Sequence, residues 1–430
     1  FIVGTLISAT SQSIDMLIVG RVLQGSAAGV VQPLVMVTIF QVFPADRRGL
    51  AMGIYGTGVV MAPAIGPALG GIMIDTFSWR HMFLMPLPFV AVAFLMGTMF
   101  MPTRAHRGPT PKFDWTGYIL LCAAIFLLLT AAAKGPREGW LSDTILLEFI
   151  LGSAAAVGFV FSQIRGRAPI LDCTLFQNLK FASAASVAFV FGAGNFASTY
   201  VIPVFVQTIQ GYTATRAGMV ILPAGLLLVA CLPLTGRAAD RLPDHIPVMA
   251  GLFFFALGMA LMVTSDVNTP FWTFAAFAMV GRFGLAFILP SLSAAALRAL
   301  PPEQLNKGSG SLNFFRQLGG AAGTNLIVVW LQLRTMFHAE ALTATQTADN
   351  NTVRQFLDTV GTSLESAGLS SALSDPMALD YLGKVVYAQA LTMAYQDSFM
   401  ILAIVFVLAL PLAWVLGRVR RQAPVAAPAE

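Results

Sequence analysis

The stretch APAIGPALGG, residues 62–71, places two prolines and three glycines in the middle of an apolar run that extends from 50 to 74. In water these residues break helices, because proline removes a backbone donor and glycine is flexible. A membrane helix tolerates them, because neighbouring helices and local adjustments satisfy the freed backbone groups. The stretch therefore indicates a membrane-spanning helix.

The composition of the whole chain agrees with this interpretation. Of 430 residues, 57% are hydrophobic and only 10% are charged, and the mean hydropathy is +0.77. Soluble domains carry about 25% charged residues. The chain has too little polar surface for a water-facing body, so lipid is its expected solvent. The net charge of +5 does not indicate nucleic-acid binding. Its significance lies in which loops carry the basic residues.

Apolar runs of about 20 residues, the length that crosses a bilayer, recur along the chain. They lie near 14–43, 50–74, 82–101, 115–133, 144–163, 180–207, 217–235, 246–265, 271–297, 309–333 and 398–417, with a partial run at 1–10. We predict an all-α transmembrane protein with these eleven full spans and one partial span. Because the chain starts inside an apolar run, we expect it to be truncated at its N-terminus.

The basic residues predict the orientation of the spans. If the spans alternate, fifteen of the 25 Lys and Arg residues fall in loops on one side and seven on the other. Basic loops favour the cytoplasm, which places the C-terminus inside. The remaining three, Arg21, Arg282 and Arg316, lie within spans.

An internal repeat divides the chain. An offset of 257 residues aligns Pro33 with Pro290, Pro44 with Pro301 and Gly66 with Gly323. Parallel repeats of helical halves are typical of secondary transporters. The offset implies roughly 80 residues before Phe1, at about 20 residues a span, and hence about fourteen spans in the intact protein.

We accordingly expect four segments. They are the remainder of an N-terminal bundle at 1–101, two extra linking spans at 112–165, a C-terminal bundle at 179–418 and a cytoplasmic tail at 419–430. The polar stretch 336–395 is an expected external loop, in which helix-like spacing of apolar residues favours an amphipathic helical hairpin.

Arg21 lies well inside a span, with Gln24 one turn later and a GxxxG pair at Gly25 and Gly29. An embedded arginine is costly unless it faces a cavity or a partner. It either extends to the outer interface or is a fixed positive charge that tunes a nearby carboxylate during proton exchange.

Small residues recur every fourth position in the opening segment, at Ala62, Gly66 and Gly70. Such a stripe lets a neighbouring backbone approach closely, and Pro63 and Pro67 are expected to bend the helix. The pattern fits either a moving interface between bundles or ordinary small-residue packing.

Two further groups are candidates for function. TGRAADRLPD, residues 235–244, ends a span with a charge cluster that is either a conformational latch or a solvated loop. Embedded polar residues suggest a substrate cavity, although lipid-facing or core positions are the alternative; they are Asn195, Tyr200, Gln207, Asn313, Arg316 and Gln317. No phosphate-binding loop, metal-ligand spacing or nucleophile elbow occurs, so we expect neither an enzyme nor a cofactor or metal site.

These motifs resemble the major facilitator superfamily, in its fourteen-helix drug:proton antiporter branch. The family's antiporter motif is G-x8-G-x3-G-P-x2-G-G. The sequence matches it with one departure, at Ala62, and the motif positions are Gly53, Ala62, Gly66, Pro67, Gly70 and Gly71. The family's R-x-x-Q-G motif matches Arg21, Gln24 and Gly25. Its loop motif is echoed around Arg237 by Gly236, Asp240 and Arg241.

The resemblance implies a proton-coupled antiporter of the bacterial inner membrane that exports small hydrophobic or cationic drugs by alternating access. Its implied partners are protons, the lipid bilayer and, as in some Gram-negative relatives, a periplasmic adaptor with an outer-membrane channel. The alternatives are a dedicated metabolite exporter or importer on the same fold, and a non-transporting membrane sensor.

Arg21→Ala is expected to abolish export while leaving membrane insertion intact, because the fixed charge would be lost from the proton-exchange site. Drug resistance of cells that make the variant at the normal level measures this. Full resistance in those cells would rule out the role of Arg21.

Overall fold

The computed structural model describes residues 1–42, 48–100, 113–166, 169–347 and 349–418, and every regular element within them is helical. The first half contains α1 (Ile2–Ala9), α2 (Ile14–Val42), α3 (Arg48–Thr76), α4 (Trp79–Leu84) and α5 (Leu87–Phe100), followed by the pair α6 (Trp115–Glu138) and α7 (Asp143–Arg165). The second half contains η1 (Cys173–Gln177), α8 (Leu179–Thr208), α9 (Ala214–Arg241), α10 (His245–Met262), α11 (Phe271–Arg298), η2 (Pro302–Gln304), α12 (Leu305–Thr343), α13 (Asn351–Ser366), α14 (Ser371–Leu408) and α15 (Leu410–Arg418). The predicted all-α fold is confirmed.

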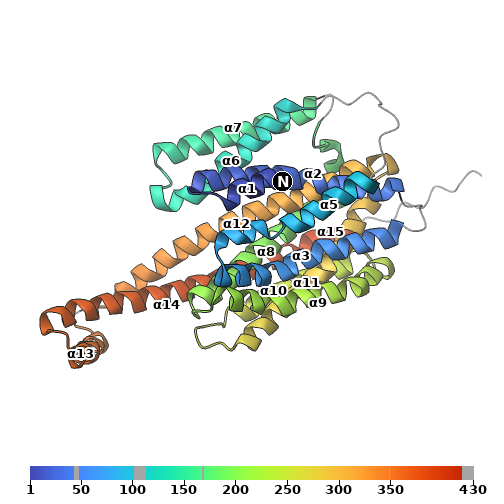
Figure 1. Ribbon diagram of the computed structural model, residues 1–430. Helices are drawn as coiled ribbons and strands as arrows, with labels where there is room; N and C mark the ends of the chain where they lie inside the picture. The colour runs from blue at the N-terminus through green and yellow to red at the C-terminus, as the bar shows by residue number, and fades with distance from the viewer. Residues whose placement is uncertain (43–47, 101–112, 167–168, 348, 419–430) are drawn as a thin grey trace, which may run out of the picture.

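Ten helical segments of the described chain are long and apolar enough to cross a membrane. They correspond to ten of the eleven predicted spans. The eleventh, at 309–333, lies within α12, where polar residues such as Asn313 and Arg316 lower the mean hydropathy. Nevertheless α12 runs beside α8 through the bundle (Figure 1).

One apolar core holds the second half together. Its buried residues all lie between Leu175 and Leu416, on η1, α8 to α12, α14, α15 and the turns between them. Aromatic rings interlock there: Phe205 stacks on Phe274 with centroids 5.3 Å apart, and Phe255 stacks on Phe406 at 3.9 Å. This core makes the second half a compact support for side chains that face the first half.

Small residues bring α3 against α9, and thus the first half against the second. A β-carbon at Gly218 of α9 would lie 2.7 Å from Cα of Ala68, and one at Gly225 would lie 2.7 Å from Cα of Ala64. Ala64 and Ala68 are correspondingly buried. The helix is continuous through Pro63 and Pro67.

This contact uses a different face of α3 from the predicted one. Ala62 and Gly66, two members of the predicted stripe, are exposed, and no described atom lies within 4 Å of a β-carbon built on Gly66. The matching positions of the second half, Gly319 and Gly323, do pack closely, against Phe189 and Ala193 of α8. Which face is close-packed depends on the neighbour, and spacing alone does not identify it.

The pair α6–α7 lies against the second half. Asn325 of α12 donates its side-chain amide to the carbonyl of Leu129 in α6, at 3.1 Å. In Figure 1 the pair forms one edge of the molecule, beyond α1 and α12.

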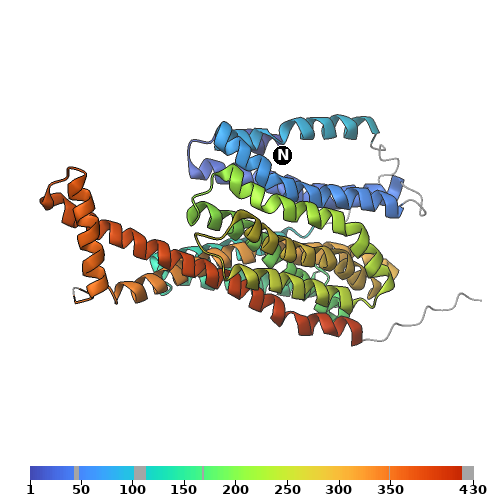
Figure 2. The ribbon, with the colours of Figure 1, turned by 90° about the horizontal axis from the view of Figure 1, so that it is seen from below.

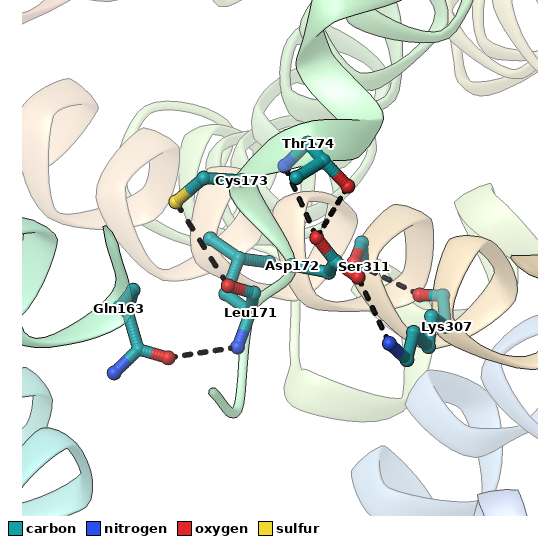
Figure 3. Close-up of polar contacts among 7 residues, drawn as sticks. All are labelled: Gln163, Leu171, Asp172, Cys173, Thr174, Lys307 and Ser311. Carbon is teal, nitrogen blue, oxygen red and sulfur yellow. Dashed lines mark hydrogen bonds and ion pairs between the residues drawn. The ribbon is translucent and has the colours of Figure 1, made fainter. Parts of the chain in front are cut away.

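A short linker between α7 and α8 is tied to its surroundings by side chains (Figure 3). The side-chain oxygen of Gln163 in α7 accepts from the Leu171 N–H at 3.0 Å. Asp172 accepts from the Thr174 hydroxyl at 2.6 Å and from the Lys307 ammonium of α12 at 2.9 Å. The linker therefore connects α7 to the start of α12.

The polar stretch 336–395 contains the expected helical hairpin. The end of α12, α13 and the first part of α14 project from the bundle at the left of Figures 1 and 2. Phe356 of α13 stacks on Tyr381 of α14 with ring centroids 6.0 Å apart. Nearer the bundle, Asp397 of α14 accepts from Arg334 and contacts His338 of α12, both at 2.6 Å.

The α3–α9 contact predicts opposite effects of one substitution at two glycines of α9. Gly218→Ala should destabilise the protein by about 1–3 kcal/mol, because the new methyl group overlaps the α3 backbone. Gly236→Ala, where no described atom lies within 4 Å of the new β-carbon, should be neutral or stabilise slightly through helix propensity. Thermal unfolding in detergent tests the pair, and equal melting temperatures would contradict the contact.

The linker predicts a pH-dependent contribution to stability. The Thr174 hydroxyl and the Lys307 ammonium hold the pKa of the Asp172 carboxyl below its ordinary value of 3.8. Because folding favours the ionised form, its stabilisation is complete above that value and is lost as the pH falls through the lowered pKa.

Asp172→Asn should therefore lower the melting temperature at pH 7, and the difference from the unsubstituted protein should shrink as the pH falls below about 4. Melting curves from pH 7 to pH 3 measure this. Lys307→Met should cause part of the same loss at pH 7. A difference that is constant over the whole pH range would exclude the ion pair as its source.

Candidate functional site

A cavity lies between α3 of the first half and α8, α9, α11 and α12 of the second. Its lining residues sit near the middle of their helices, such as Pro63 in α3 and Asn195 in α8. Most of its wall is apolar and comes from side chains that include Val60, Phe191 and Leu285. Transporters commonly place their substrate site at this depth, at the interface of the two repeats.

Arg282 of α11 is the most deeply buried charged group of the cavity wall, with 8% of its surface exposed. Its two terminal nitrogens donate to the Asn195 side-chain oxygen at 2.5 Å and to the Thr199 hydroxyl oxygen at 2.6 Å. Asn195 and Thr199 are four residues apart on α8, so their side chains lie on one face and receive the guanidinium together. The Thr199 hydroxyl in turn donates to the Asn195 carbonyl at 2.6 Å.

A second arginine, Arg316 of α12, also lines the cavity. One of its terminal nitrogens donates to the side-chain oxygen of Asn313 at 2.5 Å. Gly192 of α8 lies against the backbone of α12 at this residue, because a β-carbon there would overlap the Arg316 carbonyl. Gln317 lies next to Arg316 and contributes a further polar group.

The predicted cavity residues separate into two groups. Asn195, Arg316 and Gln317 line the cavity, and Asn313 contacts Arg316. Tyr200 and Gln207 are exposed and are not part of its lining, and the Gln207 amide bonds to the Pro203 carbonyl of its own helix.

Two residues of this polar group were missed in the sequence. Arg282 stood out as a charge inside a span but was assigned no role. Thr199 had no distinctive signal, because threonine is common in membrane helices and usually bonds to its own backbone.

Arg21 and Gln24 do come together, outside this cavity. An Arg21 terminal nitrogen donates to the Gln24 side-chain oxygen at 2.9 Å, and the Gln24 amide donates to the Thr5 hydroxyl of α1 at 2.8 Å. Gln24 is buried, whereas Arg21 is exposed and lies 5.8 Å from the centre of the Phe83 ring.

The glycines that allow close packing of α2 differ from the predicted ones. No described atom lies within 4 Å of a β-carbon built on Gly25 or Gly29. Instead, Gly20 meets α1 at Gly4, where the backbones are so close that a β-carbon on Gly4 would lie 2.6 Å from the Gly20 carbonyl oxygen. The GxxxG pair is therefore not the contact that joins α1 and α2.

The antiporter motif extends from the cavity to the end of α3. Pro63 lines the cavity, and Gly71 meets the first turn of α9. Four residues later, the Asp75 carboxylate accepts from the backbone N–H of Thr215 at 2.7 Å, which caps the start of α9. Gly70 has only an ordinary contact with Met82, and the surroundings of Gly53 lie outside the described part of the structure.

The predicted latch is only partly described. Arg237 is exposed, and no described atom lies within 4 Å of a β-carbon on Gly236. The side chains of Asp240 and Arg241 lie outside the described part. A nearby ion pair was not predicted: Arg298 of α11 donates to Asp244 at 2.8 Å.

Comparison with known proteins places the chain in a family. A sequence profile of the Major Facilitator Superfamily matches residues 1–324. The chain is 29% identical to the lincomycin resistance protein LmrB of Listeria innocua over 76% of this chain and 69% of that protein. It is 27% identical to the colistin resistance protein EmrB of Acinetobacter baumannii over 94% of this chain and 79% of that protein.

A solved structure of the peptide transporter POT in complex with sulfate shares the fold. Its TM-score is 0.57 at 12% sequence identity, and the match covers 97% of this chain and 78% of that one. The profile match and the ten helical segments long and apolar enough to cross a membrane lead to one conclusion: the chain is an integral membrane protein that belongs to the Major Facilitator Superfamily.

Proposed function

We propose that the protein exports small, largely apolar compounds through alternating access, in exchange for protons. The cavity carries this proposal. It lies between the halves at mid-depth, and apolar side chains from four helices surround a few convergent polar groups. This is the usual composition of a small-molecule site. The resistance proteins among its relatives support a drug-like substrate.

The α3–α9 contact supports alternating access. It joins the two halves through backbones packed at Gly218 and Gly225, and no ion pair of the described residues connects these two helices. Smooth surfaces of small residues can slide with little energetic cost, and the hydrogen bond from the Thr215 N–H to Asp75 lies at one end of the contact, where it would have to break or move with the helices. The antiporter motif would then provide both a wall of the cavity, at Pro63, and part of this sliding surface.

Proton coupling is supported by the Arg21–Gln24 contact. Gln24 fixes the guanidinium of Arg21 at one position in the first half, as a charge that stabilises an ionised carboxylate requires. The distribution of basic residues supports a cytoplasmic C-terminus in a bacterial inner membrane. With this orientation the α13–α14 projection is external and would be the surface for a periplasmic adaptor and its outer-membrane channel.

Transport into liposomes tests the proposed exchange. Purified protein in vesicles with an acidic interior should release protons when an apolar aromatic compound is added, as a trapped pH-sensitive dye reports. The compounds are 2-naphthylacetate, 2-naphthylacetamide and 2-(2-naphthyl)ethylammonium, which are anionic, neutral and cationic forms of one apolar body. Substrate-dependent proton movement with any of the three supports the exchange.

Val60→Trp should slow this transport at least tenfold, because Val60 lines the cavity and only 8% of its surface is exposed. Val92→Trp adds the same bulk to α5 at a position that is 57% exposed and should leave transport unchanged. The absence of proton movement with all three compounds, or equal rates for the two variants, would contradict export through this cavity.

A further inference from the structure

The polar groups of the cavity carry charge of only one sign. They are Asn195, Thr199, Arg282, Arg316 and Gln317, and none of the lining residues that the structure describes is acidic. Acidic side chains of the spanning helices occur elsewhere in the described chain. Glu148 pairs with Lys134 in α6–α7, and Asp397 pairs with Arg334 at the base of the projection.

Among the described residues of the cavity wall, no acidic side chain compensates the charge of Arg282. Its hydrogen bonds go to Asn195 and Thr199, whose oxygens are neutral. A guanidinium has five N–H donors in a fixed fork, and these two bonds occupy two of them. Neutral dipoles hold the side chain in place, but a buried charge is fully compensated only by a charge of opposite sign.

Because the surroundings of Arg282 have a low dielectric constant, its positive charge strongly affects which ligands can bind beside it. Interaction energies between charges rise several-fold when water is replaced by apolar walls. Phe191, Leu285 and Leu289 form such walls of the cavity that Arg282 lines. A ligand anion would gain a charge-assisted, two-pronged contact with the guanidinium, whereas a ligand cation would meet a charge of its own sign.

We propose that this cavity selects small apolar acids, in which an apolar body carries one carboxylate, and that Arg282 binds the carboxylate. The apolar body lies against the aliphatic and aromatic walls, and Asn195 with Thr199 orient the guanidinium from behind. This inference rests on the proposed function, because it names the substrate class of the same cavity. It narrows the hydrophobic or cationic drugs that the family resemblance implies to apolar compounds that carry a negative charge.

Asn195 provides a nearly isosteric test. Asn195→Asp replaces the amide by a carboxylate at the position that already accepts from Arg282 at 2.5 Å. The variant supplies the missing negative charge from within the protein, without removing the hydrogen bond or creating a void. It should therefore compete with an anionic ligand while preserving the fold.

The experiment is calorimetric titration of the full chain in lipid nanodiscs at pH 7.5 with the three naphthyl compounds. The unsubstituted protein should bind 2-naphthylacetate at least tenfold more tightly than the amide and should bind the ammonium compound most weakly. Asn195→Asp should weaken binding of the acid at least tenfold and leave binding of the neutral amide within twofold.

Two further variants separate charge from structure. Arg282→Lys keeps the charge and should retain the preference for the acid, whereas Arg282→Met should lose it. Arg216→Gln removes an arginine that stacks on Tyr212 at the start of α9, outside the cavity, and should change none of the three affinities. If Arg282→Met does not fold, Asn195→Asp alone decides the test.

Equal binding of the three compounds, tighter binding of the ammonium compound, or no binding would overturn the acid preference. So would an Asn195→Asp protein that binds the acid normally. These binding outcomes do not decide whether the protein exchanges compounds for protons. The liposome experiment answers that question separately, because proton movement with the anionic, the neutral or the cationic compound would each support the exchange. Proton exchange driven only by the ammonium compound would support the proposed function and overturn this inference.

Discussion

The close approach of helix backbones at small residues is the constraint on which this structure depends. Lipid gains nothing when one apolar side chain covers another, so membrane helices are held together by tight contact and by polar bonds. Between α10 and α11, Gly251 meets Gly284 and Gly258 meets Gly281, and a β-carbon at Gly251, Gly258 or Gly284 would overlap the facing helix. Gly192 brings α8 to the backbone of α12 in the same way.

These contacts determine where the polar groups lie. Arg282 stands between Gly281 and Gly284 on α11, so the two glycines face α10 while the arginine points to α8. On α8, Asn195 and Thr199 receive its guanidinium. The cost of burying a guanidinium is partly offset by these two charge-assisted bonds. An embedded arginine thus becomes a fixed element of a cavity wall.

In the antiporter motif, the spacing of small residues predicts a close helix contact but does not predict which residues make it. Small residues of α3 do allow a close helix contact, as their spacing predicts. The contact is made by Ala64, Ala68 and Gly71 against α9, whereas Ala62 and Gly66 are exposed. The helix α3 contains many small residues, so small residues spaced one turn apart occur on more than one of its faces. The position of α9 determines which of these faces makes the close contact.

The sequence by itself determined the helical class and most of the approximate span boundaries, because both the length needed to cross a bilayer and the need to satisfy the backbone within it act on short segments. It also identified Asn195, Arg316 and Gln317 as embedded polar residues. Only the tertiary structure decided that Arg282, and not Arg21, lies in the cavity between the halves. The partner Asn195 is 87 residues away along the chain, and helix packing rather than local spacing brings the two together. The sign of the cavity's charge follows from that packing, because it depends on which charged side chains the five lining helices direct to one place.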